Sequence, residues 1–228
     1  MRRTVWMLAL AAGYVDGMGL LYLGGVFCSV VTGNLVVLGV SAVQHVADTA
    51  LRAGLACVVY GVTVLLARRV APSRCLVAEL LALCTLCGGW VFAHHDPRGV
   101  TQLPLLALAA IAMGLQSAAT RDAEVQTTYL TGAVTRLATG RFDPLLLVPF
   151  ACVPVGALSA ALLLDRAPWL GPLPAVVLVA AALVAHSVPP RPPRSPTPPA
   201  ADGLDPAAQP APHHTPAHQA APHSTARR

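Results

Sequence analysis

The sequence predicts an all-α membrane protein with a disordered tail, and three observations support this. Of its 228 residues, 55% are hydrophobic and only 11% are charged, whereas soluble domains carry about 25% charged residues. Residues 1–188 contain long apolar stretches, and about 20 such residues cross the hydrocarbon core of a bilayer. Residues 189–228 are rich in Pro, Ala, His and Ser, and this composition cannot bury enough apolar surface to fold.

The membrane domain is expected to contain about six transmembrane helices and two shorter segments. The six long apolar stretches are 5–24, 50–68, 75–93, 101–119, 143–164 and 169–188. The start, Met1-Arg2-Arg3 followed by apolar residues, resembles a signal peptide, but the apolar stretch continues beyond Asp16, so we expect an uncleaved first span. The shorter stretches, 27–43 and 126–140, contain polar residues and are read as re-entrant segments or half-helices.

The distribution of arginines favours one of two topologies, because short cytoplasmic loops of membrane proteins are enriched in positive charge. If all eight stretches cross, seven arginines lie inside and five outside. If the two short stretches enter and return on the same side, the split becomes nine to three. The outer three are then Arg52, Arg98 and Arg166. We therefore expect an inner-membrane protein with a cytoplasmic N-terminus and a cytoplasmic tail, although 27–43 is apolar enough to cross.

An internal repeat divides the membrane domain into residues 1–100 and 101–188. Gly13-Tyr14-Val15-Asp16-Gly17 matches Gly114-Leu115-Gln116-Ser117-Ala118, and Thr32-Gly33-Asn34 matches Thr131-Gly132-Ala133. Each half is then expected to have three crossings and one short insertion. Because three is odd, the halves would be pseudo-symmetric and inverted, an arrangement that recurs in transporters.

The same residues resemble the signature blocks of a known family. These blocks are Gly13-Tyr14-Val15-Asp16-Gly17, Phe27 with Thr32-Gly33-Asn34, Met113-Gly114-Leu115-Gln116-Ser117-Ala118 and Thr127-Thr128-Tyr129-Leu130-Thr131-Gly132. Over about residues 5–187 the chain resembles the YoaK-like family of multi-pass bacterial and fungal membrane proteins, which are built on a domain of unknown function. The resemblance implies an inner-membrane protein and supplies no activity.

Asp16 is the sharpest candidate functional residue. It lies near the middle of the first predicted span, where a carboxylate costs roughly 2.5–3.5 kcal/mol on insertion scales. Such a group requires a partner. It either binds a cation or proton, pairs with Arg121 or Arg136, or is a hydrogen-bonded packing residue between helices.

The remaining candidates are polar or small residues inside apolar segments, and each has a functional and a packing interpretation. In a broken segment such residues satisfy exposed backbone groups and line a pathway, while in a packed bundle they allow close approach or bond across helices. They are Thr32, Gly33, Asn34, Gln116, Ser117, Thr131 and Gly132. Under inverted symmetry we expect them to converge with Asp16 near the midplane.

Three further features of the sequence give weaker evidence of function. Glu79 is expected to extend to the membrane interface. Cys84 and Cys87 are read as small apolar residues of a helix, and the tail histidines as solvated or loosely metal-binding. No catalytic motif and no nucleic-acid footprint occurs in the sequence. We therefore expect no enzyme, no cofactor, no metal and no nucleic-acid partner.

The predicted function is passage of a small solute or ion through the bilayer. The alternative is a non-transporting membrane protein, such as an assembly partner or a sensor that uses the tail.

Overall fold

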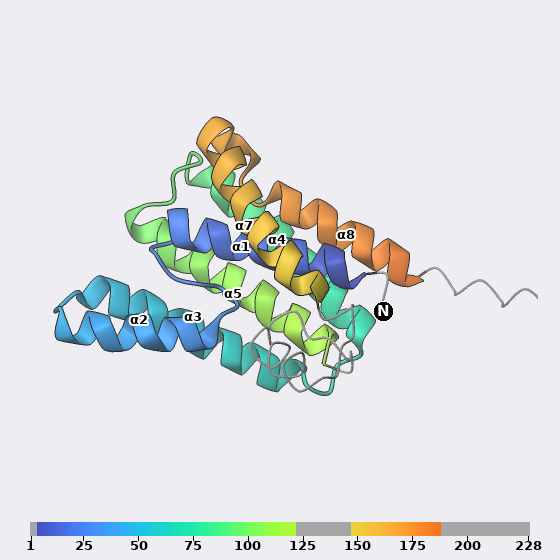
Figure 1. The fold of residues 1–228 in the computed structure, drawn as a ribbon, viewed down its shortest axis with the longest axis horizontal. Coiled ribbons are helices and arrows are strands. Elements are labelled where there is room, and N and C mark those ends of the chain that lie inside the picture. Colours follow the sequence, from blue (N-terminus) through green and yellow to red (C-terminus); the bar gives the residue numbers. More distant parts are fainter. Residues whose placement is uncertain (1–3, 122–146, 188–228) are drawn as a thin grey trace, which may run out of the picture. The chain divides into compact units, whose positions relative to one another are not determined.

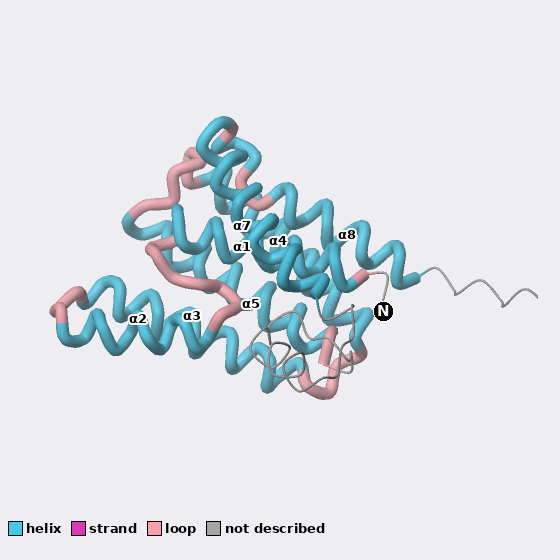
Figure 2. Tube along the Cα trace, viewed as in Figure 1, coloured by secondary structure: helices cyan, strands magenta, loops and turns pink. Residues whose placement is uncertain are grey.

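The computed structural model describes residues 4–121 and 147–187, and these residues are helical with no strand among them (Figures 1 and 2). Their contacts belong to one unit, Met1–Pro189, and the second unit, Pro190–Arg228, lies outside the described residues. The α-helices are α1 Val5–Tyr22, α2 Val31–Val43, α3 Ala47–Ala67, α4 Pro72–Phe92, α5 Gln102–Ala119, α7 Leu147–Arg166 and α8 Leu173–Ser187. Two 3-10 turns, η1 Gly99–Thr101 and η3 Pro168–Leu170, precede α5 and α8.

Four of the described helices are long and apolar enough to cross a membrane. They are Val5–Tyr22, Ala47–Ala67, Pro72–Phe92 and Gly99–Ala119, with 18 to 21 residues each, or about 27–32 Å at the α-helical rise. This range matches the hydrocarbon core of a bilayer, which indicates a membrane protein. Each of the six long stretches expected from the sequence contains a helix, although α8 has only 15 residues.

Local signals explain where these helices begin and end. Pro72 occupies the first turn of α4, where its missing N–H costs no hydrogen bond. After α1 the chain turns through Gly24 and Gly25, which have φ values of +104° and +77°, a backbone region that favours glycine.

Helix α1 lies among α5, α7 and α8, while α5 also packs on α3 and α4. Helix α4 packs on α8, and α2 packs on α3. Small residues allow the closest approaches. A Cβ atom added at Gly17 of α1 would lie 2.9 Å from the Ala157 Cα of α7, and one at Gly114 of α5 would lie 2.8 Å from the Thr63 Cβ of α3.

The helix ends show the direction of each helix in the bundle. Thr4, Leu76, Thr120 and His186 line one pocket, so the starts of α1 and α4 lie beside the ends of α5 and α8. At the other end, Gln102 Nε2 donates to Tyr22 O (3.1 Å) and Trp90 Nε1 donates to Pro168 O (2.8 Å). Helices α1 and α4 therefore run in one direction, and α5 and α8 run in the opposite direction.

The chain between α1 and α3 turns back toward the middle of α1. Tyr22 ends α1, yet Cys28 and Ser29 hydrogen-bond to Asp16, which lies six residues before that end. Helix α2 then starts at Val31, whose carbonyl faces the Cys57 Sγ in the middle of α3. The predicted segment 27–43 is thus part loop and part helix, whereas its counterpart, 126–140, falls outside the described residues.

Candidate functional site

Asp16 lies on the buried side of α1, twelve residues into the helix. Only 5% of its surface is exposed. The neighbouring residues Val15 and Met18 are fully buried, and α7 approaches α1 closely at Gly13 and Gly17. The side chain is therefore directed into protein, as the cost of a carboxylate in lipid requires.

The Asp16 carboxylate accepts three hydrogen bonds from the returning segment. The backbone N–H groups of Cys28 and Ser29 donate to Oδ1 at 2.7 and 2.8 Å, and the Ser29 hydroxyl donates to Oδ2 at 2.5 Å. Hydrogen bonds to an ionised acceptor are stronger than neutral ones. Both oxygens are thus engaged, and the carboxylate fixes the segment 28–29 against α1.

Asn34, in the first turn of α2, holds the adjacent residue Phe27. Its Oδ1 accepts from Phe27 N (2.8 Å), and its Nδ2 donates to Phe27 O (2.6 Å). A buried backbone group in a membrane protein needs such partners, because lipid provides none. Gly33 lies against the Phe27 ring, where an added Cβ would be 3.0 Å from Cδ2. Thr32 is exposed on α2.

Gln116 and Ser117 make their contacts elsewhere in the bundle. Gln116 Nε2 donates to Leu8 O of α1 (2.9 Å), and the Ser117 hydroxyl shares a hydrogen bond with the Tyr60 hydroxyl of α3 (2.7 Å). Leu8 lies eight residues before Asp16, which is about 12 Å along a helix axis. Thr131 and Gly132 lie outside the described residues. The structure therefore brings Asp16 and Asn34 together at Phe27–Ser29 and places Gln116 and Ser117 at two other contacts.

The Glu79 side chain is enclosed by protein, so the expectation that it extends to the membrane interface is wrong. It is fully buried, on the same face of α4 as Leu76 and Leu83. The reason is the helix start: α4 begins at Pro72, so Glu79 is its eighth residue and is two turns inside the helix. Neither carboxyl oxygen has a hydrogen-bond partner among the described residues.

Metal-binding residue types do not gather in the described part of the chain. Within residues 4–121 and 147–187, no three side chains of His, Cys, Asp or Glu lie close enough to hold a metal ion. Cys84 is exposed and Cys87 is half-buried on α4, and both are free thiols.

Comparison with known proteins gives a family without an activity. The family described as "protein of unknown function (DUF1275)" matches residues 4–185, which is consistent with the resemblance to YoaK-like proteins. No curated protein and no solved structure matches the chain.

Proposed function

The chain belongs to this family of unknown function, and from its geometry we propose that it is a transporter or permease for a small solute or ion. Its two halves are proposed to be inverted repeats in the inner membrane, with the N-terminus and tail in the cytoplasm. The proposed partners are the bilayer and the transported species. No enzymatic reaction and no nucleic acid enter the proposal.

The observation that carries the proposal is that helix contacts occur in matched pairs. If α1 corresponds to α5, α3 to α7 and α4 to α8, the contact of α1 with α7 corresponds to that of α5 with α3. The contact of α1 with α8 likewise corresponds to that of α5 with α4. All four contacts are present, as are α1 with α5 and α4 with α8, which lie across the proposed symmetry axis.

One pair of glycines in the repeated sequence supports the same correspondence. Gly13 and Gly114 occupy matched places in the two halves. Gly13 lies against the Val153 backbone of α7, and Gly114 lies against Tyr60 O and Thr63 of α3. The equivalent glycine therefore makes the equivalent close approach in each half.

The directions of the helices favour inversion. Helix α1 begins where α5 ends, and α4 begins where α8 ends. Corresponding helices thus run in opposite directions, which is the relation in transporters whose substrate site lies near the midplane between the halves. From the arginine distribution in the sequence, we propose that the pocket end of the bundle faces the cytoplasm.

The segment Phe27–Asn34 is the proposed wall of the pathway. Irregular backbone at membrane depth is tolerated where it is buried in protein or lines a water-filled cavity. Asp16 and Asn34 hold this segment through five hydrogen bonds. In the proposal both are positioning residues, while Thr32 and Gly33 lie where the segment becomes helical.

A non-transporting role, as an assembly partner or sensor, is the second candidate. One observation favours it: the hydrogen bonds to Asp16 already satisfy both of its oxygens. A carboxylate so engaged requires no ligand, and a purely structural segment would show the same contacts.

The proposal is tested by a solute and ion screen on the purified full-length protein, scored by thermal stabilisation and followed by flux in proteoliposomes. We expect at least one stabilising solute to be taken up by vesicles that contain the protein. Asp16→Asn should reduce this uptake strongly, and Asp48→Asn, at an exposed position, is the matched control. Ligands that stabilise the protein without any flux would favour the sensor. If no solute stabilises the protein and no flux is seen, the role as an assembly partner remains.

A further inference from the structure

The Glu79 carboxyl group is a buried titratable group that the fold does not use. It lies eight residues into α4, about 11 Å from the helix start, and its exposed fraction is 0%. Both oxygens lack a hydrogen-bond partner among residues 4–121 and 147–187. If the side chain served only to fill space, leucine would fill the position without loss of stability. The presence of a carboxyl group here therefore calls for a role other than packing.

The register of the helices locates Glu79 in the bundle. Gly89 of α4 lies beside Leu105 of α5, and Leu76 shares a pocket with Ala119, so the two helices are antiparallel. This register places Glu79 one turn deeper than Leu76, at the level of Gln116. Helix α4 packs on α5 and α8, so the buried Glu79 side chain lies on the side of α4 that these two helices cover.

Among the described residues, no group would compensate an ionised carboxylate at this position. Burying a charge without a partner is strongly unfavourable. Either a proton or a cation must therefore accompany it. A metal cation requires several oxygen ligands, and no cluster of three potential side-chain ligands occurs in the described residues. A proton requires only the carboxyl group itself.

Few charged or titratable groups surround Glu79. On its own helix, Cys75 lies one turn away. Helix α5 has no titratable side chain between Gln102 and Ala119, and Arg121 beyond its end donates to Ala67 O (3.3 Å). Helix α8 carries His186 alone, and on α1 the Asp16 carboxylate is engaged by Cys28 and Ser29. No fixed cation among these groups holds Glu79 permanently ionised.

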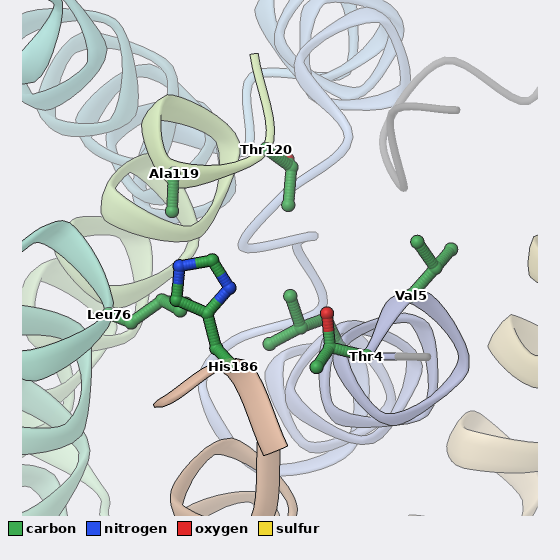
Figure 3. Close-up of a pocket in the computed structure, with 7 residues that line it drawn as sticks. Thr4, Val5, Leu76, Ala119, Thr120 and His186 are labelled. Atoms are coloured by element: carbon green, nitrogen blue, oxygen red, sulfur yellow. The ribbon is translucent and has the colours of Figure 1, made fainter. Parts of the chain in front are cut away.

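A small pocket lies at the end of the bundle, and its wall on α4 is Leu76, one helical turn before Glu79. It is lined by Thr4, Val5, Leu8, Leu76, Ala119, Thr120 and His186, and its volume is about 10 Å³, close to the room of one water molecule. The imidazole of His186 and the hydroxyl of Thr4 point into it (Figure 3), whereas the Thr120 hydroxyl donates to Gln116 O of its own helix (3.0 Å). An imidazole can relay protons, and Leu76 lies one turn from Glu79, about 4.5 Å along the axis.

We propose that Glu79 is a proton-binding site of the membrane domain, loaded and unloaded through the pocket formed by Thr4, Thr120 and His186. This inference rests on the proposed transport function and names the coupling ion as H⁺. One proton moves and no electrons do. The carboxylate takes the proton from hydronium in the pocket, leaving water, and the neutral acid returns it in the reverse step.

The test uses dicyclohexylcarbodiimide, a hydrophobic reagent that adds to protonated carboxyl groups in membranes and forms an N-acylurea without loss of atoms. The full-length protein in detergent is labelled over a range of pH values and digested with trypsin. Fragmentation of the peptide between Arg74 and Arg98 separates Glu79 from Asp96. We expect labelling of Glu79 that falls at least tenfold as the pH rises. We also expect no label at this position in Glu79→Gln and unchanged labelling in Asp48→Asn.

Two results would overturn the proton site: no adduct on Glu79 at any pH, or an equal amount at every pH. The pocket route is tested by His186→Phe, which fills the space and should slow the change in labelling after a pH jump several-fold. An unchanged rate would overturn that route. Flux in proteoliposomes separates the two proposals. If Glu79 is labelled in a pH-dependent way but no flux is found, the proposed transport function is wrong and the proton-binding site remains. If flux occurs but responds neither to a proton gradient nor to Glu79→Gln, the proposed proton site is wrong and the transport function remains.

Discussion

Asp16 and Glu79 are both buried carboxyl residues of apolar helices, yet their surroundings are opposite. Asp16 accepts three hydrogen bonds from Cys28 and Ser29, while neither oxygen of Glu79 has a partner among the described residues. If an acceptor with buried donors is removed, those donors lose their hydrogen bonds. If a group without partners is removed, no donor or acceptor becomes unsatisfied. We therefore expect the first carboxyl group to stabilise the fold, and we propose that the second binds a proton.

The largest effect on stability is expected for Asp16→Leu. Two backbone N–H groups and one hydroxyl would lose their acceptor, and each buried unsatisfied donor costs about 1–3 kcal/mol. We expect a loss of about 3 kcal/mol or more in the free energy of unfolding, measured by thermal unfolding of the detergent-solubilised protein. Asp48→Leu, at an exposed position, should change it little. A mild effect of Asp16→Leu would show that the segment 28–29 is held by other contacts.

A smaller loss is expected where α5 and α3 approach most closely. Gly114→Ala would place a Cβ 2.8 Å from the Thr63 Cβ, and such overpacking costs about 1–3 kcal/mol. Gly61→Ala, which meets nothing within 4 Å, should stabilise α3 by up to about 1 kcal/mol, because alanine is the better helix former. The same unfolding assay tests both, and a shift of the same sign in the two variants would contradict the proposed packing.

Ser29→Ala sharpens the account of Asp16 by removing a single donor. The hydroxyl contributes one hydrogen bond to a carboxylate, at 2.5 Å, and such bonds contribute about 1.5–3 kcal/mol. The two backbone donors remain, so the loss should stay below that of Asp16→Leu. In a double-mutant cycle, Ser29→Ala should have little further effect once Asp16 is leucine, and fully additive losses would show that the two side chains act independently.

The smallest change in the free energy of unfolding is expected for Glu79→Leu, and the sign of this change distinguishes Glu79 from Asp16. Leucine replaces a buried polar group that has no partner, so the free energy of unfolding should stay equal or rise. Thermal unfolding of Glu79→Leu beside Asp16→Leu gives the comparison directly. A loss as large as that of Asp16→Leu would show that Glu79 also holds the fold together.

The sequence predicted the helices but not the partners of their polar residues. The positions of the long apolar stretches depend on local composition, and each contains a helix in the structure. The need of Asp16 for a partner also follows from its place in an apolar span. Its actual donors, Cys28 and Ser29, do not, because they depend on a chain that turns back by more than one helical turn after Tyr22.

Glu79 shows a second limit of sequence reasoning. Its burial depends on α4 beginning at Pro72 and on the side of α4 that meets α5 and α8. The apolar composition of the helix is nearly uniform, so the buried side is not visible in the sequence. The Gln116 contact with Leu8 is hidden for the same reason, since it requires the pairing of two helices about a hundred residues apart.

The most direct test of the account is the membrane topology, because the segment held by Asp16 either turns back or crosses. Reporter fusions after Arg74, Arg98 and Arg194 distinguish the two cases. If the segment turns back, α1 and α4 start on the same side, as the shared pocket of Thr4 and Leu76 requires. The fusions after Arg74 and Arg194 should then report cytoplasm, and the fusion after Arg98 should report the outside. A periplasmic signal after Arg74 would mean that residues 27–43 cross the membrane and would contradict both the inverted repeat and the role given to Asp16.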